Sequence, residues 1–250
     1  MVFLPSLNGA YAFFFDFDGT LAELADTPTQ VAVENRARCA LECLFEASSG
    51  AVAIVTGREI DAIDSLLAPL RLPVAGVHGF ERRNGGGTVL ARAAEESAVR
   101  SVEKILKSFA RYNPGLLLEK KRAAFALHYR LRPELETLCV SLAEDVAGRL
   151  TEAVLTRGKM VVELRLHTAT KGTAICDFLQ EPPFRGRVPF FAGDDATDED
   201  GFAAVNGLGG VTVKVGPGGT LAQFRAASVN SFLNWLNATA EKLKETAAHG

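Results

Sequence analysis

Three short apolar runs, each followed by a helical pattern, constrain the fold of this chain more than any other feature. They lie within residues 12–17, 50–59 and 188–192. The runs are apolar on both faces rather than at alternate positions, which is typical of parallel strands covered by helices. The sequence therefore predicts an α/β fold built on a doubly wound, mostly parallel sheet.

Between about residues 80 and 168 the pattern changes to helices and alternating strands joined by short turns. The spacing of apolar residues predicts amphipathic helices over 96–112 and 133–150, with strands between and after them. This combination is typical of an antiparallel α+β unit. We therefore expect a catalytic core of residues 1–80 and 169–250, with a smaller α+β domain, residues 81–168, inserted into it.

Composition excludes several other classes of protein. The chain has 250 residues, 48% hydrophobic, and a net charge of −3, with basic residues spread along it, so nucleic acid is not an expected partner. Its four cysteines form no CxxC pair, which favours free thiols in a reducing compartment. No apolar stretch reaches the roughly 20 residues that a membrane span needs. A soluble, cytoplasmic protein is expected, with a monomer as the default.

Acidic residues follow two of the predicted strands, at the edge where open α/β sheets bind their ligands. Asp16 and Asp18 follow the first strand, whereas Asp194, Asp195 and Asp198 follow the third. Two like charges about 4 Å apart repel by roughly 4 kcal/mol near a protein surface. Such a cluster therefore needs a cation or protons among its members, and oxygen ligands favour Mg²⁺.

The spacing of Asp16 and Asp18 suits a reaction with two carboxylates. Residues i and i+2 of an extended strand point the same way, so both can act on one group. One can attack as a nucleophile and form an acyl phosphate, while the other moves a proton. For any single aspartate, a helix cap or a solvated loop residue is the alternative. Lys171, before a predicted helix, lies at a plausible anion site, although an isolated lysine would more often be solvated.

Four motifs, DFDGT, VTGR, TKG and GDDATD, occur in this order. They resemble those of the haloacid dehalogenase-like phosphatases, and the resemblance covers most of the chain outside the insert. It implies a Rossmannoid core and a Mg²⁺ cofactor. By resemblance, Asp16 is the nucleophile, Asp18 the general acid and base, Thr56 a hydrogen-bond donor to the phosphoryl group, and Lys171 the residue that neutralises charge.

The same resemblance implies a ligand set for the metal. Asp16, Asp194 and the backbone carbonyl of Asp18 would hold Mg²⁺, and Asp195 and Asp198 would lie in or near the surrounding layer of residues.

The segments GVHGFERR, LEKKRAAFALHYR and VVELR resemble a branch of that superfamily, the trehalose-6-phosphate phosphatases. The resemblance implies that the insert is a cap domain whose Glu119, Lys121 and Glu163 contact the sugar, by the charge-assisted hydrogen bonds that hydroxyl groups favour. It adds Arg58 and His78 as substrate-binding residues. Neither composition nor periodicity distinguishes Lys121 from its neighbour Lys120.

The expected function is Mg²⁺-dependent hydrolysis of trehalose 6-phosphate to trehalose and phosphate through an aspartyl-phosphate, with the chain segments near residues 80 and 168 acting as hinges. A related phosphatase for sucrose 6-phosphate or mannosyl-3-phosphoglycerate is the alternative within the class. A non-catalytic phosphosugar sensor is the alternative outside it. His78 and His128 have a further alternative as structural, hydrogen-bonding histidines.

Overall fold

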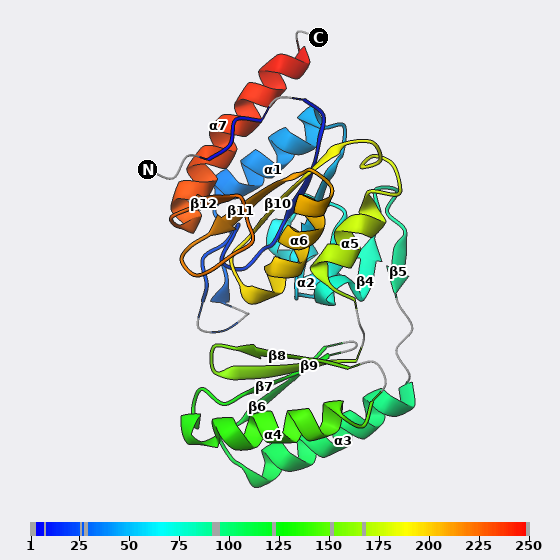
Figure 1. Ribbon diagram of the computed structural model, residues 1–250, viewed down its shortest axis with the longest axis vertical. Coiled ribbons are helices and arrows are strands. Elements are labelled where there is room, and N and C mark those ends of the chain that lie inside the picture. The colour runs from blue at the N-terminus through cyan, green and yellow to red at the C-terminus, as the bar shows by residue number, and fades with distance from the viewer. Residues whose placement is uncertain are drawn as a thin grey trace. The chain divides into compact units, whose positions relative to one another are not determined.

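The structure is a computed structural model that describes residues 4–7, 9–25, 27, 30–91, 96–121, 124–150, 153–166 and 169–248. The chain divides into two compact units (Figure 1). The core unit comprises Met1–Leu90 and Thr170–Gly250, and the cap unit comprises Ala91–Ala169. In the described part of the chain, no helix has the length and apolar content needed to cross a membrane.

The core unit contains an eight-stranded sheet in the order β12-β11-β10-β1-β2-β3-β4-β5. Strands β12 to β3 pair in parallel, and β4 pairs antiparallel with β3. The predicted doubly wound, mostly parallel sheet is confirmed. The strands are β1 (Tyr11–Phe15), β2 (Val52–Val55), β3 (Val74–Gly76), β4 (Glu81–Arg83), β5 (Val89–Ala91), β10 (Val188–Gly193), β11 (Val211–Val215) and β12 (Phe224–Ala226).

Helices cover both faces of this sheet (Figure 1). One face carries α1 (Asn35–Ala47), α2 (Ile60–Leu67) and α7 (Val229–Ala248). The other carries α5 (Lys171–Phe178) and α6 (Glu199–Gly207). Two short 3-10 helices, η2 (Val77–Gly79) and η4 (Ala196–Asp198), follow β3 and β10.

The phenylalanines of β1 explain why this strand is firmly placed. Phe13 and Phe15 belong to the apolar cluster under α1 and α7, whereas Phe14 belongs to the cluster under α5 and α6. Each is at most 2% exposed, and burying one such side chain stabilises the fold by about 1.5–3 kcal/mol. The strand is thereby fixed from both sides, which gives the residues after Phe15 a defined position.

The core unit extends further along the chain than the sequence indicated. Residues 81–90 were expected in the insert, but β4 and β5 lengthen the core sheet. Arg83 fixes β4, since its guanidinium donates to both carboxylate oxygens of Asp64 at 2.6 Å and to the Leu72 carbonyl. The segment near residue 80 is therefore part of the core rather than a linker. The second expected hinge falls at residues 167 and 168, which lie outside the described residues.

The cap unit is an antiparallel α+β structure, as predicted. Its four-stranded sheet has the order β6-β7-β9-β8. Phe125 and Leu127 of β7 and Val162 and Leu164 of β9 contribute to the apolar clusters formed with the helices. Because strand side chains alternate, neighbouring residues lie on the other face, here called the polar face. The elements are α3 (Glu96–Tyr112), β6 (Leu117–Lys120), β7 (Ala124–His128), η3 (Pro133–Leu135), α4 (Glu136–Ala147), β8 (Val154–Gly158) and β9 (Val161–Arg165).

Candidate active site

The core candidates meet at the carboxyl ends of three neighbouring strands. Asp16 and Asp18 follow β1, Thr56 follows β2, and Asp194 follows β10. Lys171 is the first residue of α5. Parallel strands place their carboxyl ends at one edge of the sheet, so residues far apart in the sequence share one site there.

Lys171 lies at the centre of this group. Its Nζ donates hydrogen bonds of 2.7 Å to one carboxylate oxygen of Asp16 and one of Asp198. All three side chains are at most 6% exposed. Burial lowers the pKa of Lys171, but the charges of Asp16 and Asp198 outweigh it and hold the pKa well above its usual value. Lys171 is therefore a fixed positive charge beside the predicted nucleophile.

Three carboxylates form a group that suits a cation. Asp16, Asp194 and Asp198 each offer an oxygen, and these oxygens lie within 4.8 Å of one another. Burial raises the pKa of Asp16 well above its usual value, that of Asp194 to about 7 and that of Asp198 to about 6, although Lys171 opposes each rise. Positive charge nearby does not offset these three carboxylates, two of them buried and that of Asp194 half-buried, and their oxygen donors fit a hard divalent cation.

Both carboxylate oxygens of Asp198 accept hydrogen bonds from the protein. One accepts from Lys171, and the other accepts from the backbone N–H groups of Asp194 and Asp195, both at 2.9 Å. It therefore shapes the loop after β10. The close approach depends on a glycine, because a Cβ at Gly193 would lie 2.2 Å from Asp198 Cγ.

Gly19 makes a similar approach possible on the β1 side. It adopts a φ of +82°, and a Cβ there would lie 2.1 Å from a carboxylate oxygen of Asp194. Glycine satisfies both the left-handed backbone and the contact. The DFDGT and GDDATD motifs thus fit against each other through Gly19.

The side chain of Asp18 is paired with Arg58 instead of joining the carboxylate group. The guanidinium donates to both carboxylate oxygens, at 2.6 and 2.7 Å. Such a bidentate pair is strong and directional. Asp18 therefore leaves only its backbone carbonyl for a metal, which is the atom that the sequence resemblance implies.

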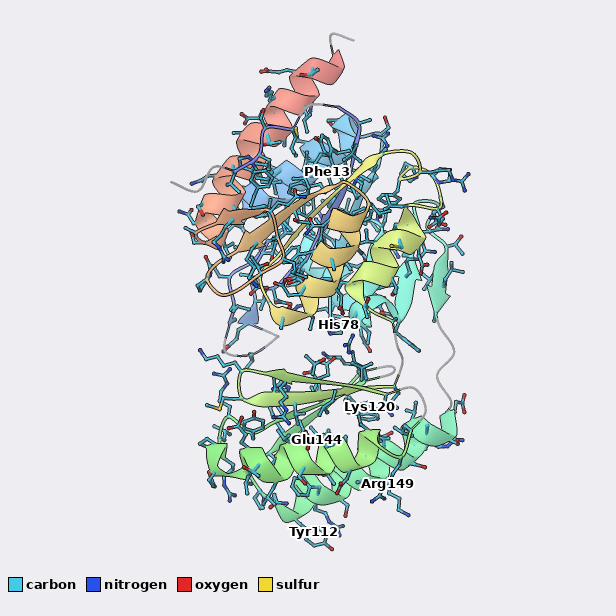
Figure 2. All side chains as sticks on the ribbon, viewed as in Figure 1. Phe13, His78, Tyr112, Lys120, Glu144 and Arg149 are labelled. Atoms are coloured by element: carbon cyan, nitrogen blue, oxygen red, sulfur yellow. The ribbon has the colours of Figure 1, made fainter. Side chains whose placement is uncertain are left out.

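Thr56 and Arg58 are held by the turn that contains His78. The N–H of His78 donates to the Thr56 carbonyl and that of Val77 donates to the Arg58 carbonyl, both at 2.9 Å. Val77 and His78 have φ values of +46° and +55°, which are uncommon for side chains other than glycine. A Cβ at Gly57 would lie 2.7 Å from the His78 ring. His78 is thus at the site edge of the core (Figure 2), where it supports the loop that carries Thr56 and Arg58.

Asp195 is tied to its own loop. One carboxylate oxygen accepts from the backbone N–H and the hydroxyl of Thr197, at 2.8 and 2.7 Å. Burial raises its pKa, but Lys171 and the Thr197 hydrogen bonds outweigh burial and lower it. Asp195 caps η4 and does not belong to the three-carboxylate group.

The three predicted sugar-binding residues come together on the polar face of the cap sheet. Glu119 and Glu163 lie opposite Ala126 on either side of β7. Lys121 donates to Glu163 at 3.0 Å, and the His128 ring lies 3.0 Å from Glu119. The hydrogen bond from His128 lowers the pKa of Glu119 although burial raises it.

Lys120 lies on the opposite side of β6 from Lys121. It donates to Glu103 of α3 at 2.6 Å, and Figure 2 shows it in the cap unit. The structure therefore distinguishes two adjacent lysines that sequence patterns could not.

Comparison with known proteins shows which family this chain belongs to. The family model of trehalose-phosphatases matches residues 14–229. This chain belongs to the trehalose-phosphatase family. The resemblance found in the motifs is thus confirmed, and the chain is an enzyme, a phosphoric monoester hydrolase.

The relatives of this chain cover most of its length. The trehalose-6-phosphate phosphatase of Escherichia coli K12 is 43% identical over 96% of this chain and 91% of its own length. A probable trehalose-phosphate phosphatase of Sinorhizobium fredii is 42% identical over 83% of this chain and 78% of its own length. The crystal structure of a trehalose-6-phosphate phosphatase related protein superposes with a TM-score of 0.76 at 26% identity, covering 94% of this chain and 99% of its own.

Sequence reasoning missed one polar residue at the site of this trehalose-phosphatase. Lys214 of β11 is 4% exposed, and its Nζ donates to the backbone carbonyls of Asp194 and Asp195. The available signal was a lysine within the strand VTVKV, whose other residues are valines and one threonine. Its partners are backbone atoms, which no side-chain motif reveals.

Proposed function

We propose that this trehalose-phosphatase hydrolyses trehalose 6-phosphate to trehalose and phosphate, in a Mg²⁺-dependent reaction through an aspartyl-phosphate. The observation that carries the mechanism is the buried carboxylate of Asp16, bound to Lys171 within a group of acids at the strand ends. The substrate is inferred from the Escherichia coli relative, a trehalose-6-phosphate phosphatase at 43% identity.

Asp16 is the proposed nucleophile. One of its oxygens accepts from Lys171, and the other lies 3.4 Å from the Thr20 hydroxyl. Its carboxylate oxygen attacks phosphorus, the bond from phosphorus to the sugar oxygen breaks, and an aspartyl-phosphate forms on Asp16. Lys171 offsets the negative charge of the phosphoryl group, and the Thr56 hydroxyl donates a hydrogen bond to it.

Asp18 is the proposed general acid and base. It gives a proton to the sugar oxygen as that oxygen leaves, and then takes one from the water that attacks the aspartyl-phosphate. The bidentate pair with Arg58 holds this carboxylate at one place before reaction. For Asp18 to donate a proton it has to leave this pair and take up a proton from water, and the guanidinium is then available to the phosphate.

The donor set fits a magnesium ion. Asp16, Asp194 and the backbone carbonyl of Asp18 would hold it, with Asp195 and Asp198 beside them. When bound, Mg²⁺ supplies positive charge that offsets the charges of the phosphate and the carboxylates. The raised pKa values of Asp194, about 7, and Asp198, about 6, support the need for such a cation.

Substrate selection is assigned to the cap unit. We infer that Glu119, Lys121 and Glu163 bind the sugar hydroxyls, whereas Arg58 and His78 bind at the phosphate side. Charged groups make stronger hydrogen bonds to hydroxyls than neutral ones do, which favours their use for a polyhydroxylated ligand.

A phosphate-release assay tests this function. Trehalose 6-phosphate, sucrose 6-phosphate, mannosyl-3-phosphoglycerate and a small aryl phosphate are each supplied with Mg²⁺ or with EDTA. We expect the highest kcat/KM for trehalose 6-phosphate and loss of release in EDTA. Faster release from another phosphosugar, or full activity in EDTA, would contradict the proposal.

A further inference from the structure

Lys214 is a buried cationic side chain that the proposed reaction does not use. It pairs in register with Gly193 of β10, the residue directly before Asp194. Its Nζ donates to the carbonyl of Asp194, and the Asp195 carbonyl lies at 3.4 Å. The side chain thus joins β11 to the loop that carries the proposed metal ligand.

A buried lysine at position 214 destabilises the fold unless its ammonium group has hydrogen-bond partners. Burying an ammonium group away from water costs several kcal/mol unless hydrogen bonds compensate. The neighbouring residues Val213 and Val215 are apolar core residues of β11. An apolar residue at position 214 would avoid that cost, so the hydrogen bonds to the loop are the feature that the lysine contributes.

Two side chains, those of Asp198 and Lys214, form hydrogen bonds to the backbone of the loop after β10. Asp198 accepts from the backbone N–H groups of Asp194 and Asp195, and Lys214 donates to their carbonyls. The three peptide groups from Gly193 to Ala196 are therefore fixed. A fixed backbone sets the direction of the Cα–Cβ bond of Asp194, and its carboxylate lies beside Gly19 and within reach of Asp16.

We propose that Lys214 is a positioning residue for the cation site, which holds the backbone of Asp194 and Asp195 so that the Asp194 carboxylate faces Asp16. This inference rests on the proposed Mg²⁺ site. Lys214 would touch neither the substrate nor the side chain of a metal ligand, and it would act on the site through the loop.

The sign of the effect on Mg²⁺ binding distinguishes positioning from simple electrostatics. Removing a positive charge close to a cation site strengthens cation binding, because a repulsion is lost. Losing the hydrogen bonds that hold a loop with a metal ligand weakens cation binding, commonly by about 10–100-fold for residues that orient metal ligands. Weaker binding in a neutral variant therefore cannot come from the charge change alone.

The test is isothermal titration calorimetry of metal-free full-length protein with Mg²⁺, without substrate. For Lys214→Met we expect the Mg²⁺ dissociation constant to rise about tenfold or more. The Mg²⁺ concentration for half-maximal phosphate release should rise equally, whereas KM for trehalose 6-phosphate at saturating Mg²⁺ should stay within about twofold. Unchanged or tighter Mg²⁺ binding would overturn the inference.

Thr212→Val provides the matched control. Thr212 is a buried residue of the same strand, two positions earlier, and its hydroxyl bonds to Asn206 and to the Gln223 N–H. This variant should lower Tm yet leave Mg²⁺ affinity unchanged. An equal loss of affinity in Thr212→Val would mean that any damage to β11 weakens the site, and the inference would fail.

A second variant keeps the test decisive if methionine prevents folding, as judged by circular dichroism. Lys214→Gln places its amide nitrogen one atom closer to the backbone than Nζ, so it should not reach both loop carbonyls and should bind Mg²⁺ more weakly than the wild type. Wild-type affinity in Lys214→Gln would contradict positioning. Failure of the wild type to bind Mg²⁺ would instead overturn the proposed metal site, and this inference with it.

Discussion

The core site and the polar face of the cap differ in how their charged residues are held. In the core, Lys171 bonds two carboxylates at once, and no member of this trio is more than 6% exposed. In the cap, the side chains of Glu119 and His128 are 34% and 30% exposed and share one hydrogen bond. Exposed pairs hold side chains weakly. The core trio thus holds fixed charges, as the proposed phosphoryl transfer needs, whereas this cap pair can adjust, as the proposed contacts to a sugar need.

The largest effect is expected in the core, from Asp16→Asn. Removal of the proposed nucleophile should lower kcat by about 10³-fold or more for every substrate, aryl phosphates included. Steady-state phosphate release measures this loss. Asp61→Asn on α2, which alters an exposed carboxylate of the core unit, serves as the control and should retain full turnover. Substantial activity in Asp16→Asn would refute its assigned role.

A smaller and selective effect is expected in the cap, from Lys121→Met. Losing a charged hydrogen-bond donor costs about 1.5–3 kcal/mol, or roughly 10–100-fold in kcat/KM for trehalose 6-phosphate. An aryl phosphate should be hydrolysed nearly as well as before. Lys120→Met is the matched control, because Lys120 faces α3 and pairs with Glu103. If both variants lose the same activity, the polar face has no special part in binding.

The acid group of the core predicts a pH-dependent response to Mg²⁺. The pKa of Asp194 is about 7 in the folded protein against an ordinary value of 3.8. Without metal, the carboxyl group of Asp194 ionises less readily in the folded protein than in the unfolded chain. The free energy of unfolding therefore falls as pH rises from about 4 to about 7. Mg²⁺ favours the ionised form, so it should raise Tm more at pH 8 than at pH 5.5. Each kcal/mol corresponds to about 2–4 °C. Scanning calorimetry in EDTA and in Mg²⁺ measures both rises, and equal rises would count against the cation site.

The smallest effect is expected from His128→Ala, which removes the partner of Glu119. A net hydrogen bond contributes about 0.5–1.5 kcal/mol, so kcat/KM for trehalose 6-phosphate should fall by roughly 3–10-fold. The aryl phosphate should be unaffected, which a parallel assay checks. A similar loss on both substrates would show that His128 supports the fold of the cap rather than the position of Glu119.

Much of the core could be predicted because its signals are local in sequence. Continuous apolar runs define strands buried on both faces, and the acids that follow them must gather at one edge of a parallel sheet. The phenylalanines of β1 follow this rule, since Phe13 and Phe14 reach opposite apolar clusters. The end of the core near residue 80 could not be predicted in this way, because β4 is a strand of only three residues. The contact that holds it, between Arg83 and Asp64, joins residues 19 positions apart.

The contacts that distinguish similar side chains could not be predicted, because their partners are distant in sequence. The choice between Lys120 and Lys121 depends on Glu103 and Glu163, which belong to other elements of the cap. The pairing of Asp18 with Arg58 spans 40 positions. The sequence resemblance supplied roles for these residues, and only the fold supplies the atoms that hold them.

The division of labour between core and cap is tested most directly by Glu119→Ala, assayed on trehalose 6-phosphate and on a small aryl phosphate at saturating Mg²⁺. Glu144→Ala serves as the control, since it alters a half-exposed carboxylate of α4 paired with Arg157 (Figure 2). We expect Glu119→Ala to lower kcat/KM for trehalose 6-phosphate, relative to that for the aryl phosphate, by about tenfold or more. Aryl phosphate hydrolysis and the control variant should be unchanged. An equal loss on both substrates would contradict this division of labour.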